Sequence, residues 1–126
     1  MSNPSFEPPA QPLRYVVLRH EGVAQPHFDL MLETAPGAAL ATWRIPRWPI
    51  DEQINIDKVA EHRRDYLDYE GPISGDRGHV KRVTAGTYRL DRKFDTLWDI
   101  TLLTPAPQQR LILATTLPDQ WAVVPL

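Results

Sequence analysis

Turn-forming residues interrupt this chain at short intervals, and this punctuation limits each regular element to a short one. The sequence contains 13 proline and 6 glycine residues. Proline breaks helix interiors and has no donor for a central β-ladder, and glycine supports tight turns. The breaks fall at Ala35-Pro36-Gly37, Ile45-Pro46, Trp48-Pro49, Gly71-Pro72, Ser74-Gly75, Arg77-Gly78, Ala85-Gly86 and Pro105-Ala106-Pro107. Such spacing is typical of an all-β sandwich or barrel.

Short segments with strand composition or strand-like alternation lie between these breaks. They span residues 14–19, 27–33, 40–45, 79–83, 86–90, 96–103, 110–115 and 121–124. We therefore predict an all-β fold, a small antiparallel β-barrel with one short helical segment. Residues 51–69 are charged and long enough for a turn or two of helix, and Val59, His62 and Tyr66 recur there at helix-like intervals. We interpret this stretch as a short strand or helix that passes over one mouth of the barrel.

The composition predicts a single domain over residues 13–126, preceded by an irregular lead-in over residues 1–12. Hydrophobic residues make up 42% of the chain, which is enough for a packed core. The lead-in, in contrast, is rich in proline and poor in large apolar side chains. The absence of cysteine excludes a disulfide framework and a thiolate metal site. Because no signal peptide and no run of about 18 apolar residues occurs, we expect a cytoplasmic monomer without a membrane segment.

The net charge of −2 argues against a protein that coats nucleic acid through bulk electrostatics. That binding mode needs many lysine and arginine residues to neutralise phosphates. Most of the 14 basic residues nevertheless lie between Arg44 and Lys93. This concentration is either an ordinary mixed surface or a local phosphate-binding patch.

The segment His27-Phe28-Asp29-Leu30-Met31-Leu32-Glu33 carries the first candidate site residues. Strand alternation places its apolar residues on one face, toward the core, and His27, Asp29 and Met31 on the other. An imidazole and a carboxylate two residues apart on a strand can converge on one cation. Taken alone, the pair also fits a solvent-facing strand with ordinary polar residues.

Two further histidines fall where the chain can bring them to this strand. His20 ends the preceding strand, and a hairpin would place it beside the start of the next one. His62 lies in the charged segment, with Tyr66 one helical turn further on. We assign the remaining histidine, His79, to the surface. Three of the four histidines could therefore meet near Asp29, and two imidazoles with one carboxylate form a donor set that suits Mn²⁺, Fe²⁺ or Zn²⁺.

Four pieces of the sequence follow one another in an order that resembles a known family. They are His20, then His27-Phe28-Asp29, then Trp43-Arg44-Ile45-Pro46-Arg47, then His62 with Asp65-Tyr66 and Asp68-Tyr69-Glu70-Gly71-Pro72. This series is similar to that of the 3′-phosphoesterase domain of bacterial DNA ligase D. That family has a His, a His-Tyr-Asp-Phe-Arg-Leu-Glu strand, a Trp-Ala-Val-Pro-Lys segment, and a His-Pro-Leu-Asp-Tyr segment before Phe-Glu-Gly. The resemblance extends over residues 15–88.

The resemblance implies a compact β-barrel and a manganese-dependent hydrolase that trims DNA 3′ ends in non-homologous end joining. Such an enzyme removes a terminal ribonucleoside and then the 3′-phosphate. Its partners would be DNA or DNA–RNA 3′ ends, with end-joining ligase and polymerase proteins acting in trans. By position, His20, Asp29 and His62 would be the metal ligands. His27 would contact the scissile phosphate or act as a general acid, and Tyr66 would supply an active-site hydroxyl.

The sequence departs from the family at its phosphate-binding arginines. Met31 stands in place of the arginine of the His-x-Asp strand, and residues 53–56 contain no counterpart of a second one. Arg44 and Arg47 stand where the family has Ala and Lys, and we take them as candidate phosphate-binding residues. Because the planar guanidinium fork matches a phosphate in a bidentate way, its loss is hard to replace. We therefore expect activity weaker than in the arginine-bearing family and partly restored by Met31→Arg.

Two other classes of function remain open from the sequence. A non-catalytic metal-containing module that binds DNA ends or a repair partner would accord with the missing arginines. A non-haem iron oxygenase would use His27, Asp29 and His62 as a facial triad. The oxygenase fits less well, since 126 residues are few for that barrel together with a substrate pocket.

Overall fold

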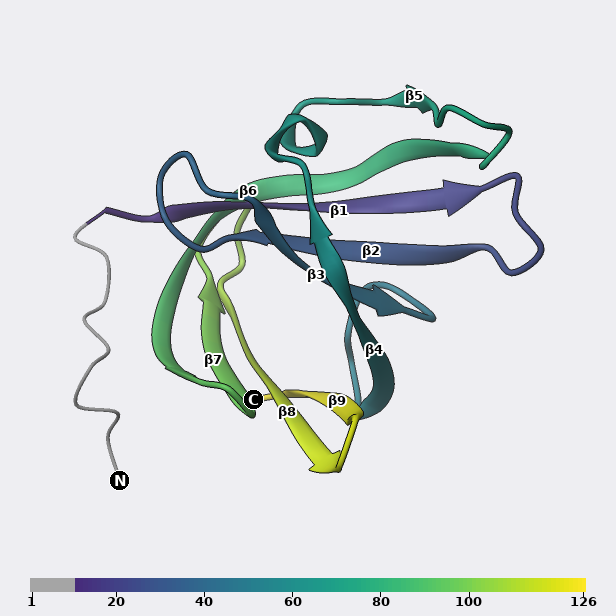
Figure 1. Cartoon of the computed structure of the whole chain (residues 1–126). Helices are drawn as coiled ribbons and strands as arrows, with labels where there is room; N and C mark the ends of the chain where they lie inside the picture. Colours follow the sequence, from purple (N-terminus) through teal and green to yellow (C-terminus); the bar gives the residue numbers. More distant parts are fainter. Residues whose placement is uncertain (1–10) are drawn as a thin grey trace.

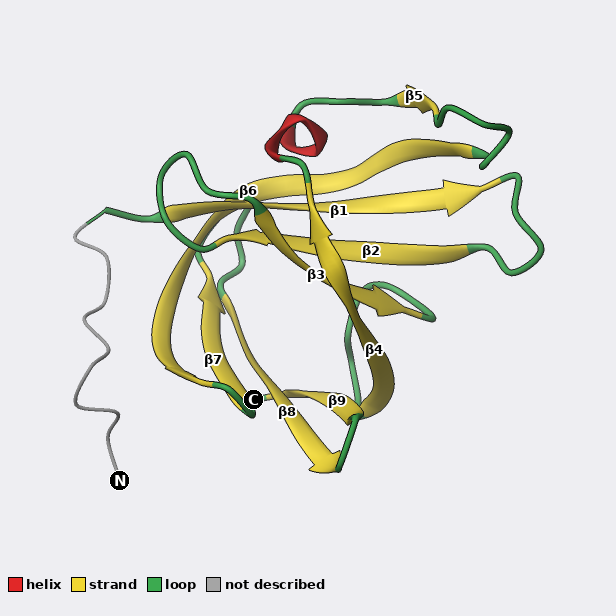
Figure 2. Ribbon diagram, viewed as in Figure 1, coloured by secondary structure: helices red, strands yellow, loops and turns green. Residues whose placement is uncertain are grey.

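The computed structural model describes residues 11–126 and consists almost entirely of β-strands (Figure 1). The strands are β1 (Leu13–Glu21), β2 (His27–Glu33), β3 (Leu40–Ile45), β4 (Ile54–His62), β5 (Gly71–Pro72), β6 (His79–Phe94), β7 (Leu97–Leu102), β8 (Gln109–Leu117) and β9 (Gln120–Pro125). The one helical element of these residues is the 3-10 turn η1 (Arg64–Leu67), drawn in red in Figure 2. The predicted lead-in lies outside the described residues except for its last two positions, and β1 begins at residue 13.

Strand β1 pairs with both β2 and β6, and this double pairing closes the sheet into a barrel. The order around the wall is β1-β2-β3-β4-β9-β8-β7-β6, and the pairings are antiparallel. The two-residue strand β5 lies outside this circle and pairs with β6. The predicted small antiparallel barrel with one short helical turn is therefore confirmed. In the described part of the chain, no helix is long and apolar enough to cross a membrane.

The segment over residues 51–69 differs from the prediction in its position. Its first part is β4, a strand of the barrel wall between β3 and β9. The helical part is limited to η1, which packs on the outer face of β1 instead of over a mouth. Figure 1 shows η1 and β5 above β6 and β1. The helix-like spacing of His62 and Tyr66 thus arises from the end of a strand and a tight turn.

Strand β6 is one continuous strand, although residues 79–83 and 86–90 were predicted as two strands with a turn at Ala85-Gly86. Gly86 lies inside the strand, where a Cβ atom would be 1.9 Å from the carbonyl oxygen of Thr104. The main-chain N–H groups of Leu103 and Thr104 donate to the carbonyl of Thr87 at 2.9 and 3.3 Å. Glycine in a strand interior often marks such a close approach of another backbone. The glycine that we took for a turn is therefore a packing requirement.

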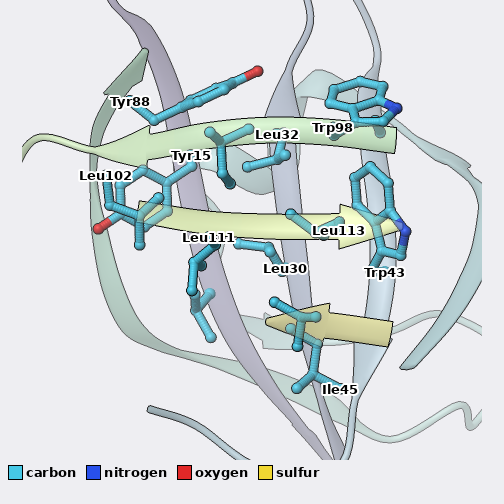
Figure 3. Packing of buried hydrophobic residues seen from close by; sticks show 14 of the residues in the cluster. Tyr15, Leu30, Leu32, Trp43, Ile45, Tyr88, Trp98, Leu102, Leu111 and Leu113 are labelled. Carbon is cyan, nitrogen blue, oxygen red and sulfur yellow. The ribbon is translucent and has the colours of Figure 1, made fainter. Parts of the chain in front are cut away.

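Large apolar side chains fill the barrel interior (Figure 3). Trp43 makes edge-to-face contacts with Trp98 and Trp121, with ring centroids 5.0 and 5.6 Å apart. Tyr15 and Tyr88 lie at the opposite end of the core in Figure 3. Because successive side chains of a strand point to opposite faces, only one face of each strand contributes side chains to this interior.

A second apolar cluster lies on the outer face of the wall. It consists of Val16, Leu18, Met31, Leu40, Leu67 and Val80. Residues 63–78, which we call the cover segment, bury it with Leu67 and with partly buried Tyr66 and Ile73. The outward face of β2 is therefore buried as well, although its sequence also fitted a solvent-facing strand. Polar residues at one end of this buried face form the candidate site.

Candidate metal centre

The hairpin of β1 and β2 positions three of the candidate ligands. His20 lies opposite His27, and Leu18 lies opposite Asp29, in the antiparallel register. Gly22, with a φ of 74°, opens the connecting loop in the left-handed region that suits glycine. The predicted hairpin is confirmed, and His20, His27 and Asp29 all project from the outer face of the wall.

These three side chains form a compact, largely buried group. One His20, one His27 and one Asp29 ligand atom all lie within 4.8 Å of one another. Nε2 of His27 is 3.4 Å from Oδ1 of Asp29, and Nδ1 of His20 is 3.8 Å from Oδ2. His27 is 8% exposed and Asp29 is 3% exposed. Such burial of a carboxylate is costly unless it is paired or binds a cation.

Main-chain carbonyls hold one nitrogen of each of these two imidazoles, and the other nitrogen is free. Nε2 of His20 donates to the carbonyl of Arg77 at 2.7 Å, and Nδ1 of His27 donates to that of Gln25 at 2.9 Å. In these tautomers the second nitrogen of each ring carries a lone pair, and it faces Asp29. Metal-ligating histidines in proteins commonly have their other nitrogen held by such a carbonyl.

Two buried atoms of this group have no hydrogen-bond partner within residues 11–126. They are Nε2 of His27 and Oδ1 of Asp29. Two acceptors that face each other at 3.4 Å repel unless a proton or a cation lies between them. The residues present therefore fit a divalent cation, with two imidazole nitrogens and a carboxylate oxygen as the donor set.

His62 and Tyr66 lie at the same pocket, beside the three-residue group. The pocket has a volume of about 280 Å³, and its lining includes His20, Asp29, Arg44, His62 and Tyr66. Nδ1 of His62 donates to the carbonyl of Ala60 at 2.9 Å, so its Nε2 is also free. The structure thus gathers every predicted metal ligand at one pocket. His27 was predicted as a general acid or a phosphate contact. In the structure it belongs to the compact group with His20 and Asp29, in the place that the prediction gave to His62.

The two candidate arginines have different surroundings. Arg44 lies opposite Asp29 in the β2–β3 register, lines the pocket, and has no carboxylate partner among the described residues. Arg47 is absent from the pocket lining and pairs with Asp51 and Glu52. The structure therefore brings Arg44 to the site and does not bring Arg47 there. Met31 also lines the pocket, although it is 1% exposed within the outer cluster.

Arg77 lies at the site and was not among the residues predicted from the sequence. Its carbonyl orients His20, and the residue lines the pocket from the cover segment. The only local signal was the turn-forming pair Arg77-Gly78, which gives no hint of a partner 57 residues earlier in the chain. The cover segment therefore buries the outer cluster and also orients the candidate ligand His20 through the carbonyl of Arg77.

No known protein-family model matches the chain, and no curated protein sequence matches it either.

Proposed function

We propose that the protein is a divalent-metal-dependent phosphoesterase that acts on nucleic-acid 3′ ends, like the ligase D domain that its motifs resemble. The observation that carries the proposal is the buried group of His20, His27 and Asp29, whose free ligand atoms face one another. A divalent cation, with Mn²⁺ as our first choice, would act as a Lewis acid and neutralise phosphate charge. The pocket beside the group has room for a terminal phosphate.

The side chains around the pocket supply the remaining functions. The unpaired guanidinium of Arg44 binds a phosphate oxygen through charge-assisted hydrogen bonds. Water attacks phosphorus and gives up a proton, the bond from phosphorus to the leaving oxygen breaks, and a proton goes to that oxygen. The leaving oxygen is the 3′ oxygen of the strand when a 3′-phosphate is hydrolysed, and the 5′ oxygen of the terminal nucleoside when a ribonucleoside is released. Free Nε2 of His62 accepts the proton of the attacking water, and the hydroxyl of Tyr66 provides the proton for the leaving oxygen. His27 has one free nitrogen, and that atom faces Asp29.

A second candidate is a non-catalytic module that binds 3′ ends or an end-joining partner through the same metal centre. The observation that favours it is Met31. Its side chain is buried where the family has a phosphate-binding arginine, so Arg44 is the one predicted phosphate-binding arginine at this pocket. Both candidate functions require a bound cation, but only the phosphoesterase hydrolyses the 3′ end.

The deciding experiment measures release of phosphate or a ribonucleoside from duplexes that end in a 3′-phosphate or a 3′-ribonucleotide, with Mn²⁺. We expect turnover by the wild type, no turnover by Asp29→Asn, and a rate about 10²- to 10³-fold lower for Arg44→Ala. His79→Ala is the matched control, because His79 is exposed and outside the pocket lining. Binding of these ends without turnover by the wild type supports the non-catalytic module.

A further inference from the structure

A second pocket adjoins the candidate metal centre. It has a volume of about 310 Å³ and lies within the cover segment, lined by Arg63, Asp65, Tyr66, Tyr69, Ser74 and Arg77 among others. Tyr66, Ile73 and Arg77 also line the first pocket. A ligand that occupies the first pocket can therefore extend into the second past these shared side chains.

Aromatic rings continue from the candidate centre into the second pocket. The rings of His62 and Tyr66 are 5.7 Å apart, and those of Tyr66 and Tyr69 are 5.9 Å apart, both edge to face. Tyr69 is 37% exposed and donates its hydroxyl hydrogen to the carbonyl of Pro72. A Cβ atom at Gly71 would lie 3.0 Å from that hydroxyl, so glycine permits this ring position. The cover segment thus holds an aromatic ring at the pocket surface in a fixed orientation.

The charges around this pocket fit a polar aromatic ligand. The guanidinium of Arg77 is held by the carbonyl and hydroxyl of Ser74, at 2.7 and 3.2 Å. Neither Arg63 nor Arg77 has a carboxylate partner in the described part of the chain. Asp65 places a carboxylate in the same lining, which disfavours a bare phosphate there. Aromatic rings with mixed donors and acceptors are how proteins bind single-stranded bases.

We propose that the second pocket binds the base of the nucleotide whose 3′ end reaches the metal centre. This inference rests on the proposed function and specifies its substrate. The pocket has a volume of about 310 Å³, its walls come from one short segment, and Tyr69 is the exposed ring of its lining, so we expect it to hold one unpaired base. The 3′ nucleotide is therefore unpaired when it binds, and the preferred substrate is a single-stranded or frayed 3′ end. The base stacks on Tyr69, and Arg63 and Arg77 contact the backbone or the base edge.

The test measures binding, and it uses the full chain with Mn²⁺ and a 5′-fluorescein DNA strand of eight nucleotides. The strand ends in a 3′-hydroxyl, so it cannot turn over, and a second strand lacks only the last base. For wild type, loss of the base should weaken binding about five- to 150-fold by anisotropy. Tyr69→Ala should weaken binding of the normal strand by a similar factor. In Tyr69→Ala, loss of the base should have little further effect, because the two changes remove one contact.

Two control variants separate stacking from charge and from unfolding. Tyr69→Phe keeps the ring and loses only the hydrogen bond to Pro72, so it should retain most of the affinity that Tyr69→Ala loses. Arg63→Ala should weaken binding of both strands, whereas Arg89→Ala, which removes an exposed arginine outside both pocket linings, should not. Mn²⁺ binding by calorimetry should be unchanged in Tyr69→Ala, which shows that the fold and the first site are intact.

The inference and the proposed function can fail separately. Independent effects of Tyr69→Ala and of base removal, tighter binding of a blunt duplex than of the single strand, or no binding of the strand would each overturn the base site. If the protein nevertheless hydrolyses a 3′-phosphate, the proposed phosphoesterase function stands and only the base site is rejected. Coupled binding effects without turnover support the base site and overturn the phosphoesterase.

Discussion

At the residue scale, each of the three imidazoles around the candidate centre has one nitrogen held by a main-chain carbonyl. The carbonyls belong to Arg77, Gln25 and Ala60. Fixing one nitrogen selects the tautomer and orients the ring, so the free nitrogen is already in place before a cation binds. The imidazole rings then lose less conformational freedom when a cation binds, and this favours cation affinity.

Substitutions in the three-residue group should remove cation binding. We expect His20→Ala, His27→Ala and Asp29→Asn each to weaken Mn²⁺ binding at least about tenfold in calorimetry, because the first two remove a donor nitrogen and the third removes the negative charge of the carboxylate. His79→Ala should bind like the wild type. His62→Ala tests the predicted ligand: a matching loss makes His62 a ligand, and unchanged affinity assigns it to the pocket wall.

Met31→Arg should destabilise the protein in addition to any effect on activity. The methionine side chain is buried in the outer cluster with Leu18 and Val80, so an arginine there would bury a charge or displace the cover segment. We expect a loss of about 2–4 kcal/mol in denaturant unfolding, whereas Met31→Leu should cost less than about 1.5 kcal/mol. Unchanged stability with higher turnover would instead support the expectation, from the sequence, that arginine restores a phosphate contact.

At the element scale, the close approach of the β7–β8 connection to β6 depends on Gly86. Gly86→Ala places a methyl group against the carbonyl oxygen of Thr104, and backbone atoms must move to accept it. We expect a loss of about 1–3 kcal/mol in the free energy of unfolding. Gly37→Ala is a useful comparison, because its added atom meets nothing within 4 Å and it carries only the cost of a positive φ, about 1 kcal/mol.

Strands β6, β7 and β8 share a buried carboxylate, Asp99, which is 1% exposed. Arg110 binds both its oxygens at 2.9 and 2.7 Å, and Arg92 binds one at 3.1 Å. The hydrogen bonds from Arg110, with the one from Arg92, hold the pKa of Asp99 below its ordinary value despite its burial. The ionised form is therefore favoured more in the folded chain than in the unfolded one.

This lowered pKa gives stability that depends on pH with a definite sign. The contribution is complete above the unfolded value of about 4 and is lost as pH falls through the lower, folded value. Asp99→Asn should cost about 1–2 kcal/mol at neutral pH, because both arginines are half exposed and can be solvated. The difference between the two proteins in urea unfolding should shrink below pH 4. A constant difference down to pH 2 would contradict this assignment.

At the scale of the whole molecule, the barrel and the cover segment have different numbers of supporting contacts. Strand β1 is paired on both edges and buried on both faces, through Val16 and Val17. The cover segment is attached by the apolar side chains of Leu67, Tyr66 and Ile73 and by the short β5 ladder. Ion pairs of Arg64 with Glu33 and of Asp68 with Arg14 add to this attachment. We infer that the cover can open while the barrel stays folded.

Hydrogen exchange tests this difference. Amides of β1 should exchange through global unfolding, and that of Tyr66, whose acceptor is the carbonyl of Arg63 at 3.2 Å, should exchange earlier. Leu67→Ala should speed exchange in the cover segment more than in β1. It should also weaken Mn²⁺ binding, since the carbonyl of Arg77 orients His20. Equal protection of both regions would show that cover and barrel unfold as one unit.

The sequence by itself determined the local elements and the fold class. Strand alternation and turn residues predicted β2 and β3 at their observed bounds, the hairpin of His20 and His27, and an antiparallel barrel. These features depend on residues close in the chain, so local periodicity and turn chemistry suffice to predict them. The same alternation placed His27 and Asp29 on one face. The predicted ligand set nevertheless had His62 in the position that His27 takes in the compact group.

Only the tertiary structure decided which groups surround that face. Residues 63–78 fold back over β1 and β6, bury Met31, and bring Tyr66 and Arg77 to a pocket shared with Asp29. His62 reaches the same pocket from the end of β4. No local pattern encodes this cover, because it depends on apolar contacts between segments far apart in sequence. Gly86 is a second example, because the sequence suggested a turn there, whereas in the fold its missing side chain lets the backbone of Thr104 come close. Long-range packing, and not composition, therefore set the arrangement of the candidate site.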